Sequence, residues 1–375
     1  MSSLVTNLLI LFLVWYGSVC PTSSVPYEYS ISNLDLDKFT SEKEVFHLFQ
    51  IWKKENEREY QTLEEEAARF QIFKSNLKYV REKNAKRKSP NNSRLALNKF
   101  SDMSYEEFSK IYLHDEIENP IMEGNNSKMI LNDASCPNAP SSWDWRTKGA
   151  VTYVKDQGQC GGCWAFSATG AIEGITQIVS KWLPDLSEQQ LISCDTSNNG
   201  CNGGRYSRAF QYVIDNGGIT SEAQYPYTAD NSSCNSAWCQ NIITTIDGYN
   251  YWYHTPISES SLRCFVYSQP VSVSLYASAE FKSYAGGIFK GDDCLDNGSC
   301  KHNHAVLIVG YGSSDDGEDY WIVKNSWGAD WGEQGYILIK RNTGSTPGVC
   351  NINCSGAYPT KGNNEIPALK VATSI

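Results

Sequence analysis

The sequence is poor in basic charge and has no stripe of clustered lysine and arginine. Of its 375 residues, 32 are Lys or Arg and 42 are Asp or Glu, which gives a net charge of −10 at pH 7. Binding to nucleic acid or to an anionic membrane requires clustered cations that neutralise phosphates, so we expect neither as a partner. Beyond the amino terminus no apolar run is long enough to span a bilayer, and we expect no membrane span.

Histidine is also scarce. The chain has five histidines, of which only His302 and His304 form a close pair. Structural zinc sites use three or four ligands, usually in two spaced pairs. The sequence therefore gives little support to a zinc site, and we expect neither a bound metal nor a cofactor.

The amino terminus carries an apolar run from Leu8 to Trp15 that ends in small residues. The run is too short to cross a bilayer comfortably. This pattern is typical of a secretory signal peptide, although no Lys or Arg precedes the run. We assign the signal peptide to residues 1–24, with cleavage between Ser18 and Ser24, and a buried amino-terminal helix is the alternative.

Cysteine, by contrast, is abundant. Thirteen cysteines behind a signal peptide indicate an oxidising compartment and disulfides. If Cys20 leaves with the signal peptide, twelve cysteines remain. A free thiol kept for chemistry leaves eleven to share among bridges, so at least one more must be unpaired.

The chain changes in character along its length. Residues 41–84 are rich in Glu, Lys, Leu and Phe without Gly or Pro, which predicts helices. A linker with Pro and Gly follows at residues 116–140. Later, short β-branched runs bounded by Gly and Asp predict strands at residues 304–312, 320–327 and 335–341. A helical half followed by a β half predicts an α+β fold of two lobes with a cleft between them.

Two cysteines three residues apart, Cys160 and Cys163, stand in GQCGGCWAFS directly before a predicted helix. The spacing fits a redox dithiol, half of a zinc site, or one structural cysteine beside one reactive cysteine. Cys194 and Cys201 follow in a nearby loop and offer Cys160 a structural partner. Cys163 then remains free, which favours nucleophilic catalysis over the redox and zinc interpretations.

Cys163 begins the predicted helix, whose positive end favours a thiolate. Making the thiolate dominant near neutrality requires lowering the thiol pKa from about 8.5 by roughly two units, or about 2.7 kcal/mol, which calls for a cationic histidine alongside. His304 at the start of a predicted strand is the candidate. Asn325 ends the adjacent predicted strand, where its amide can accept the second ring N–H and fix the tautomer.

Several blocks of this sequence resemble those of the papain-like cysteine proteases. QGQCGGCWAFS, NHAVLIVGYG and NSWGADWGEQGY are similar to the cysteine, histidine and asparagine blocks of that family. The helical region resembles the family's inhibitory propeptide, first in the pattern E-x3-R-x3-F-x2-N-x3-I-x3-N and then in G-x-N-x-F-x-D. The residues that carry these two patterns are Glu65, Arg69, Phe73, Asn76, Val80, Asn84, Ala96, Asn98, Phe100 and Asp102. RNTG, GVC and YPTK near the end are similar to plant members.

The resemblance implies a papain-like two-lobed α+β fold, with a helical lobe and an antiparallel β-barrel lobe, preceded by a helical propeptide. We assign the inhibitory propeptide to residues 25–138 and the peptidase domain to residues 139–375. Within the peptidase domain, we expect the helical lobe at residues 150–248, the β lobe at 249–360 and a carboxy-terminal tail at 361–375.

The resemblance also implies that the protein is a cysteine endopeptidase. In this scheme Cys163 attacks the peptide carbonyl, and His304 pairs with the thiolate before it protonates the leaving amine. Asn325 orients the imidazole, and Trp327 shields their hydrogen bond from water. The side chain of Gln157 and the backbone N–H of Cys163 stabilise the oxyanion, where one lost donor typically costs about 3 kcal/mol.

Further residues are implied to contact the substrate, several of them in the pocket for the second side chain before the cut. These residues are Gly203, Gly204, Arg205, Tyr206, Ser274, His302, Asn303, Ala305, Trp327 and Ser355. Family members commonly have apolar residues at several of these places. We hypothesise a weakened preference for bulky apolar side chains and a shift towards polar or acidic ones, because Arg205 can pair with a carboxylate. An Arg205 that points into water is the alternative.

The disulfides carried over from the family are Cys160–Cys201, Cys194–Cys234, and Cys350 with either Cys294 or Cys300. A Cys300–Cys354 bridge is added as a guess. No partner is assigned to Cys136, Cys239 or Cys264.

The propeptide is expected to fold onto the enzyme, fill the cleft and act as an intramolecular inhibitor. Acid protonates carboxylates in the contact, so we predict that processing near residues 136–140 speeds up as the pH falls. The other expected partners are protein or peptide substrates and cystatin-type inhibitors, and we expect a monomer. A papain-fold protein with weak or no proteolysis, used for storage, defence or binding, is the alternative function.

The signal peptide and the cysteines place the protein in the secretory pathway, with the vacuole, the lysosome or the extracellular space as the final compartment. Sequons at Asn91, Asn125, Asn231 and Asn297 are predicted glycan sites, whereas the sequon at Asn353 is expected to be unused.

Overall fold

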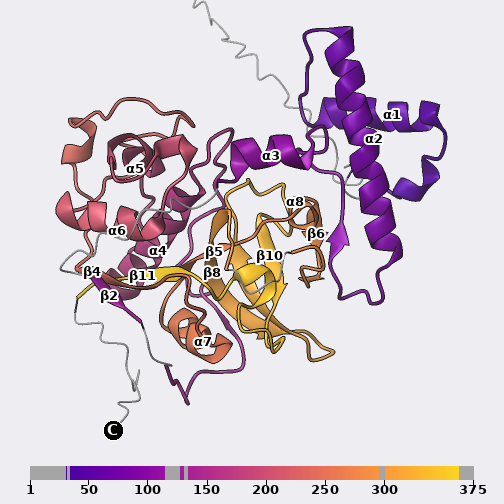
Figure 1. Cartoon of the computed structure of the whole chain (residues 1–375). Coiled ribbons are helices and arrows are strands. Elements are labelled where there is room, and N and C mark those ends of the chain that lie inside the picture. The colour runs from indigo at the N-terminus through magenta and orange to yellow at the C-terminus, as the bar shows by residue number, and fades with distance from the viewer. Residues whose placement is uncertain (1–30, 32–33, 115–126, 131–133, 295–299, 363–375) are drawn as a thin grey trace, which may run out of the picture.

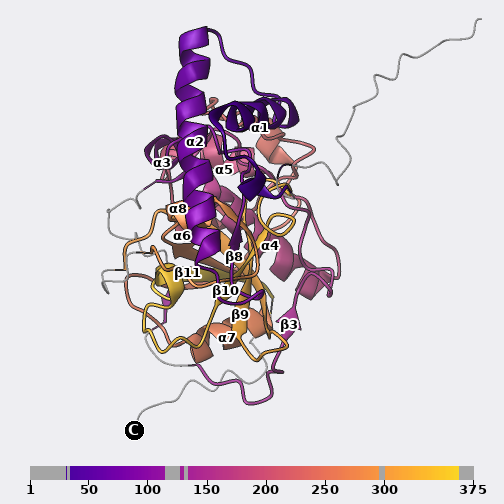
Figure 2. The same ribbon diagram turned by 90° about the vertical axis from the view of Figure 1, so that its right-hand side faces the viewer.

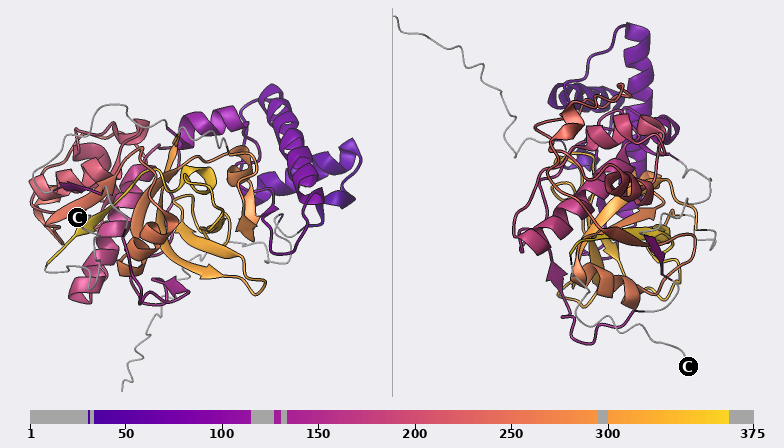
Figure 3. Two further views of the ribbon diagram at one scale, coloured as in Figure 1. Left: turned by 60° about the horizontal axis from the view of Figure 1, so that its bottom comes forward. Right: turned by 90° about the vertical axis from the view of Figure 1, so that its left-hand side faces the viewer.

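The computed structural model describes residues 31, 34–114, 127–130, 134–294 and 300–362, so the predicted signal peptide and most of the predicted tail lie outside it. Figure 1 shows an amino-terminal group of helices at one end, a second group of helices at the other, and a sheet between them. The left view of Figure 3 shows the same order from below. Three clusters of buried apolar side chains accompany these parts. The predicted α+β class, with a helical region ahead of two lobes, is confirmed.

The amino-terminal unit contains α1 (Glu42–Glu55), α2 (Leu63–Ala85), the short strand β1 (Arg94–Leu95) and α3 (Tyr105–Tyr112). α1 begins at a capping box between Ser41 and Glu44, and α3 begins at another between Ser104 and Glu107. In each box the serine oxygen accepts from a backbone N–H of the first turn, and the glutamate accepts from the serine N–H. The amino-terminal ends of both helices are therefore fixed by the local sequence.

Polar residues on one face of α2 bind the segment that follows it. The Asn76 side chain donates to Ser101 O at 2.8 Å. The Asn84 side chain donates to Leu95 O at 2.8 Å and accepts from Leu95 N at 2.9 Å. Phe73 of the same face is fully buried in the aromatic core of the unit. The propeptide pattern thus has a physical basis, because its polar members satisfy backbone groups and its apolar members fill the core.

The helical lobe contains α4 (Cys163–Ser180), α5 (Glu188–Cys194) and α6 (Tyr206–Asp215). α4 is buried along most of its length and packs against the sheet. At Gly170 a Cβ atom would lie 2.8 Å from Leu307 Cδ2, so glycine permits this close approach. No helix among the described residues is both long and apolar enough to cross a membrane.

The remaining α-helices and strands form the β lobe and its edges, and all of these strands except β6 belong to one sheet. They are β2 (Ser127–Met129), β3 (Trp143–Asp144), β4 (Gly248–Trp252), α7 (Glu259–Ser268), β5 (Val271–Leu275), α8 (Ala279–Lys282), β6 (Tyr284–Gly286), β7 (Ile288–Phe289), β8 (His304–Ser313), β9 (Asp319–Lys324), β10 (Tyr336–Lys340) and β11 (Gly356–Thr360). The sheet order is β2-β4-β11-β5-β8-β9-β10-β7, and β3 also pairs with β8. Two parallel pairings, β2–β4 and β7–β10, depart from the antiparallel expectation.

The amino-terminal unit lies on the β lobe, and Figure 2 shows α2 in front of its strands. β1 pairs antiparallel with β6. The side chain of Asn98 donates to Lys282 O at 2.8 Å, and Lys83 forms an ion pair of 2.9 Å with Glu280. Tyr79 OH donates to Asp293 at 3.0 Å. Backbone, neutral and charged contacts together hold the unit in place.

Residues ahead of the predicted boundary at 138 already contact the catalytic part. β2 pairs with β4, as Figure 1 shows, and Ile130 N donates to Tyr251 O at 2.8 Å. Cys136 is bonded to Cys264 of α7. By its contacts, this stretch belongs with the two lobes and not with the amino-terminal helices.

Within the described residues there are five disulfides: Cys136–Cys264, Cys160–Cys201, Cys194–Cys234, Cys294–Cys350 and Cys300–Cys354. Of the two partners considered for Cys350, the structure therefore has Cys294. Among the described cysteines, Cys163 and Cys239 are free. Asn91 and Asn231 are solvent-accessible, Asn353 is fully buried, and the sequons at Asn125 and Asn297 lie outside the described residues.

Candidate active site

Cys163 is the first residue of α4, and the loop that leads into it is fixed on both sides. Cys160 is bonded to Cys201, and Gly161 N donates to Cys201 O at 2.9 Å. At Gly162 a Cβ atom would lie 2.6 Å from Ile192 Cδ1. The sulfur of Cys163 is free and lies at the positive end of α4.

His304 and Asn325 come from neighbouring strands of the β lobe. His304 is the first residue of β8, and Asn325 directly follows β9, which pairs with β8. His304 Nε2 lies 2.8 Å from Asn325 Oδ1. The same oxygen accepts from Ser326 N at 2.9 Å, which identifies it as the amide oxygen. His304 Nε2 therefore donates to Asn325, and Nδ1 carries the lone pair.

The two lobes meet at the sulfur. Cys163 Sγ accepts a hydrogen bond of 3.4 Å from the backbone N–H of Ala305, the residue after His304. His304 Nδ1 is buried and has no hydrogen-bond partner within the described part of the chain. The amino-terminal end of α4 thus places the Cys163 thiol against the backbone of Ala305, which directly follows His304 in the chain.

Trp327 covers the imidazole. Its ring centroid lies 4.6 Å from that of His304, and it is fully buried. Phe100 and Phe108 of the amino-terminal unit contact Trp327 edge-on, with centroids 5.6 and 5.1 Å away. The propeptide side chains therefore extend the apolar cover over the His304–Asn325 hydrogen bond.

Gln157 is fully buried beside the loop before α4. Its Nε2 donates to Cys160 O at 2.9 Å and to Tyr112 O at 3.2 Å. Its Oε1 accepts from Ser326 Oγ at 2.7 Å, which fixes the orientation of the amide. Because Tyr112 ends α3, a carbonyl of the amino-terminal unit occupies the donor that was expected to bind an oxyanion.

The residues after α3 run directly over the site. His114 N donates to Asn303 O at 3.0 Å. At Gly161 a Cβ atom would lie 1.7 Å from Cδ2 of the His114 ring, so the ring occupies that place. The sequence did not predict the contacts of Tyr112 and His114 with the site. The one hint in the sequence was that both residues follow the second propeptide pattern, which ends at Asp102.

Burial beneath this cover determines the protonation of the pair. It raises the pKa of Cys163 to about 11, against a partial offset from the Ala305 N–H, and lowers the pKa of His304 to about 4, against a partial offset from Asn325. Both groups are therefore neutral near pH 7. Two charges buried here would lack the solvation that they need, so the thiolate–imidazolium pair remains a prediction for the site without this cover.

Arg205 does not point into water, so that alternative is wrong. Its side chain is 2% exposed, and its guanidinium lies 4.1 Å from the ring centroid of Tyr253 and donates to the hydroxyl of that tyrosine. Nearby, Ser274 Oγ donates to Tyr206 OH at 3.1 Å, and Ser274 N donates to Ser355 O at 3.1 Å. The predicted pocket residues of the two lobes are thus joined by polar contacts.

The other predicted substrate residues lie on the same two walls. Gly203 has a φ of 102°, which only glycine adopts easily. At Gly204 a Cβ atom would lie 2.6 Å from the Trp164 ring. On the β side, Asn303 Oδ1 accepts from Ala277 N at 2.8 Å, and the His302 ring lies 2.7 Å from a backbone oxygen.

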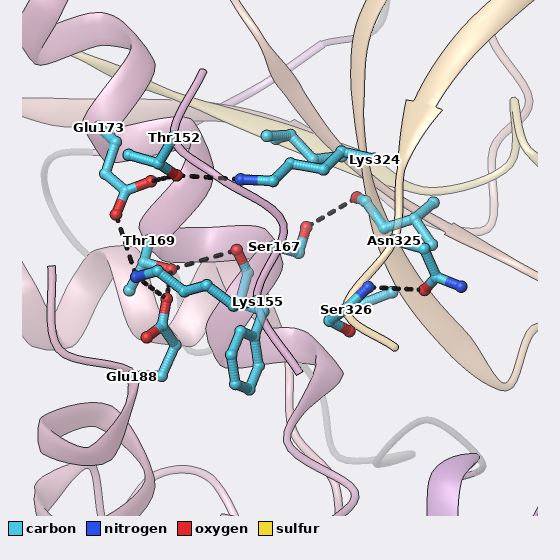
Figure 4. A pocket seen from close by; sticks show the side chains of 13 residues that line it. Thr152, Lys155, Ser167, Thr169, Glu173, Glu188, Lys324, Asn325 and Ser326 are labelled. Atoms are coloured by element: carbon cyan, nitrogen blue, oxygen red, sulfur yellow. Dashed lines mark hydrogen bonds and ion pairs between the residues drawn. The ribbon is translucent and has the colours of Figure 1, made fainter. Parts of the chain in front are cut away.

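A buried ionic cluster that the sequence did not reveal lies behind the site (Figure 4). Lys155 lies 2.8 Å from Glu188 and 3.3 Å from Glu173. Lys324 donates to Thr152 Oγ1 at 2.9 Å, and burial lowers its pKa to about 8. Asn325 and Ser326 line the same pocket, so this cluster forms the back wall of the site.

Comparisons with known proteins agree along the whole described chain. Residues 139–360 match the family model described as papain family cysteine protease, and residues 49–108 match the cathepsin propeptide inhibitor domain (I29). The "P34 probable thiol protease" of Glycine max is 46% identical over 364 residues, which cover 95% of this chain and 94% of the relative. "Cysteine protease XCP2" of Arabidopsis thaliana is 44% identical, over 89% of this chain and 92% of the relative.

Two solved precursors have the same fold. The recombinant stem bromelain precursor has a TM-score of 0.74 at 37% identity, covering 84% of this chain and 99% of its own. The Amb a 11 cysteine protease, a ragweed pollen allergen in its proform, has a TM-score of 0.75 at 33% identity, covering 89% and 100%.

Removing the amino-terminal unit should greatly increase the reactivity of Cys163. With a thiol pKa of about 11, roughly one thiol in 10⁴ is ionised at pH 7, whereas a pKa near 7 ionises about half. We expect alkylation by iodoacetamide to accelerate on the order of 10³-fold after processing, measured by mass spectrometry.

Two variants identify the labelled thiol. Cys163→Ala should abolish the fast reaction, and Cys239→Ser, which removes the other free thiol of the described chain, should leave it intact. Equal alkylation rates before and after processing would contradict the neutral, covered pair.

Proposed function

The chain belongs to the papain family of cysteine proteases, and on that basis we propose that Cys163, His304 and Asn325 are the residues with which it cuts peptide bonds. It is a cysteine endopeptidase made as a precursor with a propeptide inhibitor domain. One observation carries the residue assignment. His304 donates a 2.8 Å hydrogen bond to Asn325, and the free Cys163 at the start of α4 contacts the residue after His304.

The proposed reaction begins when His304 Nδ1 takes the proton of Cys163. The thiolate attacks the peptide carbonyl carbon, and the oxyanion that forms accepts hydrogen bonds from Gln157 Nε2 and the backbone N–H of Cys163. The C–N bond then breaks as Nδ1–H passes its proton to the leaving amine. Water, deprotonated by His304, then attacks the thioester carbonyl carbon. The C–S bond breaks, the carboxylic acid product leaves, and His304 returns the proton to the sulfur of Cys163.

Asn325 and Trp327 act on the imidazole and not on the substrate. By accepting from Nε2–H, Asn325 keeps Nδ1 as the nitrogen that exchanges protons with Cys163. Trp327 keeps water from competing for that hydrogen bond, since its ring covers the imidazole. Both are positioning residues.

The amino-terminal unit inhibits by occupying the reacting groups. The Tyr112 carbonyl takes the donor of Gln157, and His114 N pairs with Asn303 O, where a substrate backbone would bind. The same cover keeps Cys163 and His304 neutral. Protein substrates and cystatin-type inhibitors would have to displace this segment or bind after it has left. The expected location remains the secretory pathway.

Acid weakens the amino-terminal unit through its own carboxylates. Hydrogen bonds from Lys53 and Gln50 hold the pKa of Glu66 below its usual range. Burial pushes the pKa of Glu107 up, but its contacts with Ser104 and Arg69 outweigh burial and lower it. A lowered carboxyl pKa stabilises the fold above about pH 4.5, and this contribution is lost as the pH falls through the lowered value. Glu280 acts in the opposite sense, because burial raises its pKa.

The disulfide Cys136–Cys264 affects how the propeptide is released. A cut between Cys136 and Pro140 separates the two parts of the chain, but the upstream part keeps Cys136 and so stays bonded to Cys264. β2 adds its pairing with β4 to this tether. We propose that such a cut frees the propeptide only after the disulfide is reduced.

Hydrolysis of a fluorogenic peptide by the processed protein tests the function. Cys163→Ala should abolish activity, and Gln157→Ala should lower kcat on the order of 10²-fold because one oxyanion donor is lost. Asn325→Ala should lower kcat by roughly 10- to 100-fold, since one buried hydrogen bond is worth about 1.5–3 kcal/mol to a charged imidazole. KM should change little in both variants.

Absence of hydrolysis in the presence of a thiol reductant, by processed protein whose Cys163 still reacts with iodoacetamide, would reject the endopeptidase assignment. That result would support the alternative, a papain-fold protein used for storage, defence or binding.

Incubation of the precursor between pH 7 and pH 4 tests both release steps when the samples are run on two gels, one without and one with reductant. Processing should accelerate as the pH falls below about 4.5 and through the lowered pKa values of Glu66 and Glu107, because protonation removes their stabilising contacts. When the cut falls between Cys136 and Pro140, the product should run as one species without reductant and as two with reductant.

Cys264→Ser is the matched control, because it should separate into two species on both gels. Equal processing rates at all pH values would contradict the acid mechanism. Two separate species from the unmodified protein without reductant would contradict the tether.

A peptide library varied at the second residue before the cut tests the pocket. The Arg205 guanidinium is buried against Tyr253, and polar Ser274 donates to Tyr206, the residue after Arg205. Because these groups are polar or cationic, we predict better cleavage of polar or acidic residues than of the family's usual Leu or Phe. Arg205→Leu should lower the Glu-to-Leu ratio of kcat/KM about tenfold. Arg208→Leu, in the first turn of the helix that follows Arg205, is the control and should leave this ratio unchanged. An unaltered preference for Leu or Phe would refute the hypothesis.

A further inference from the structure

Three sulfur atoms form a cluster away from the proposed active site. Cys194, the last residue of α5, is bonded to Cys234. The free Cys239 has its sulfur 3.6 Å from that of Cys194, and all three sulfurs lie within 4.8 Å of one another. A free thiol in contact with a disulfide sulfur is the arrangement from which thiol–disulfide exchange begins.

Cys234 and Cys239 lie at the two ends of one short turn. Trp238 N donates to Asn235 O at 3.0 Å, and the Cys239 thiol lies 3.5 Å from the same oxygen. Trp238 packs edge-on against Tyr225 with ring centroids 5.0 Å apart. This turn presents both cysteines to Cys194. The three sulfur distances do not place Cys239 in line with the Cys194–Cys234 bond, so the turn must also carry the Cys239 sulfur towards that line before it can attack. The sulfur of Cys239 must approach by about 1.5 Å to reach the usual bond length of about 2.05 Å.

We propose that Cys194 exchanges its disulfide partner between Cys234 and Cys239, and that Cys234 is thereby a site of covalent thiol modification. The thiolate of Cys239 attacks Cys194 Sγ, the Cys194–Cys239 bond forms, and the Cys194–Cys234 bond breaks. Cys234 leaves as a thiolate and takes up the proton that Cys239 released. The number of disulfides is unchanged, so the step consumes no oxidant or reductant.

The two pairings differ in which thiol the solvent can reach. Cys239 is 8% exposed, whereas Cys234 is exposed. In the second pairing the free thiol is therefore at the surface, where a small disulfide or a soft electrophile can react with it. Attack of the Cys234 thiolate on a small disulfide forms a mixed disulfide and releases one small thiol.

The test uses the full-length Cys163→Ala precursor, which lacks the active-site thiol and cannot process itself. It is incubated without reductant at about pH 8, near the ordinary thiol pKa, with oxidised glutathione in one sample and iodoacetamide in another. Chymotryptic cleavage after Trp238 separates Cys234 from Cys239, so mass spectrometry can assign each label. We expect label on Cys234 in both samples, and Cys194–Cys239 peptides beside Cys194–Cys234 peptides.

Two further variants in the same background separate exchange from simple exposure. Cys239→Ser removes the attacking thiol, so labelling of Cys234 should fall at least tenfold. Cys234→Ser should fold and contain a Cys194–Cys239 disulfide. The Cys160–Cys201 bridge of the same samples is the internal control and should stay unlabelled. The proposal is overturned if Cys234 remains unlabelled while only the Cys194–Cys234 linkage is recovered, or if folded Cys234→Ser keeps Cys194 and Cys239 as separate thiols.

Discussion

The contact between the start of α4 and the start of β8 is the constraint on which the site depends. One end of this contact is a thiol that α4 presents at its positive end, and the other is the backbone N–H of the residue after His304. α4 is buried along most of its length, and β8 lies in the middle of the sheet, so neither can shift without disturbing a core. Rigid packing of two lobes, and not a flexible loop, therefore sets the geometry of the reacting groups.

In the precursor, burial keeps the groups of the site unreactive. An exposed thiol and imidazole can share a proton and carry charges, but beneath the amino-terminal unit both remain neutral. The inhibitor does this with backbone groups of Tyr112 and His114 and with aromatic rings on Trp327. In the proposed mechanism, inhibition and protection from water are thus one structural effect, and a polar face of α2 holds the segment that produces it.

The sequence predicted the family, the α+β fold and the precursor form, which the comparisons confirm, because short motifs fix the residues next to α4, β8 and α2. It did not predict the cluster of Lys155, Glu173 and Glu188, since residues far apart along the chain meet there without a motif. Cys136–Cys264 spans 128 residues, and cysteine spacing alone cannot select such a pair. The protonation of Cys163 also could not be predicted, because it depends on what covers the sulfur.

β2 has a consequence for the behaviour of the enzyme after processing. As the outermost strand beside β4, it supplies hydrogen-bond partners to backbone groups that would otherwise face solvent. An uncovered strand of this kind readily pairs with another chain and promotes aggregation. With β2 in place the outermost strand has three residues, whereas without it the five-residue β4 would be outermost. A shorter edge strand is a weaker template for pairing with another chain, so an enzyme that keeps β2 should associate with itself less readily at high concentration.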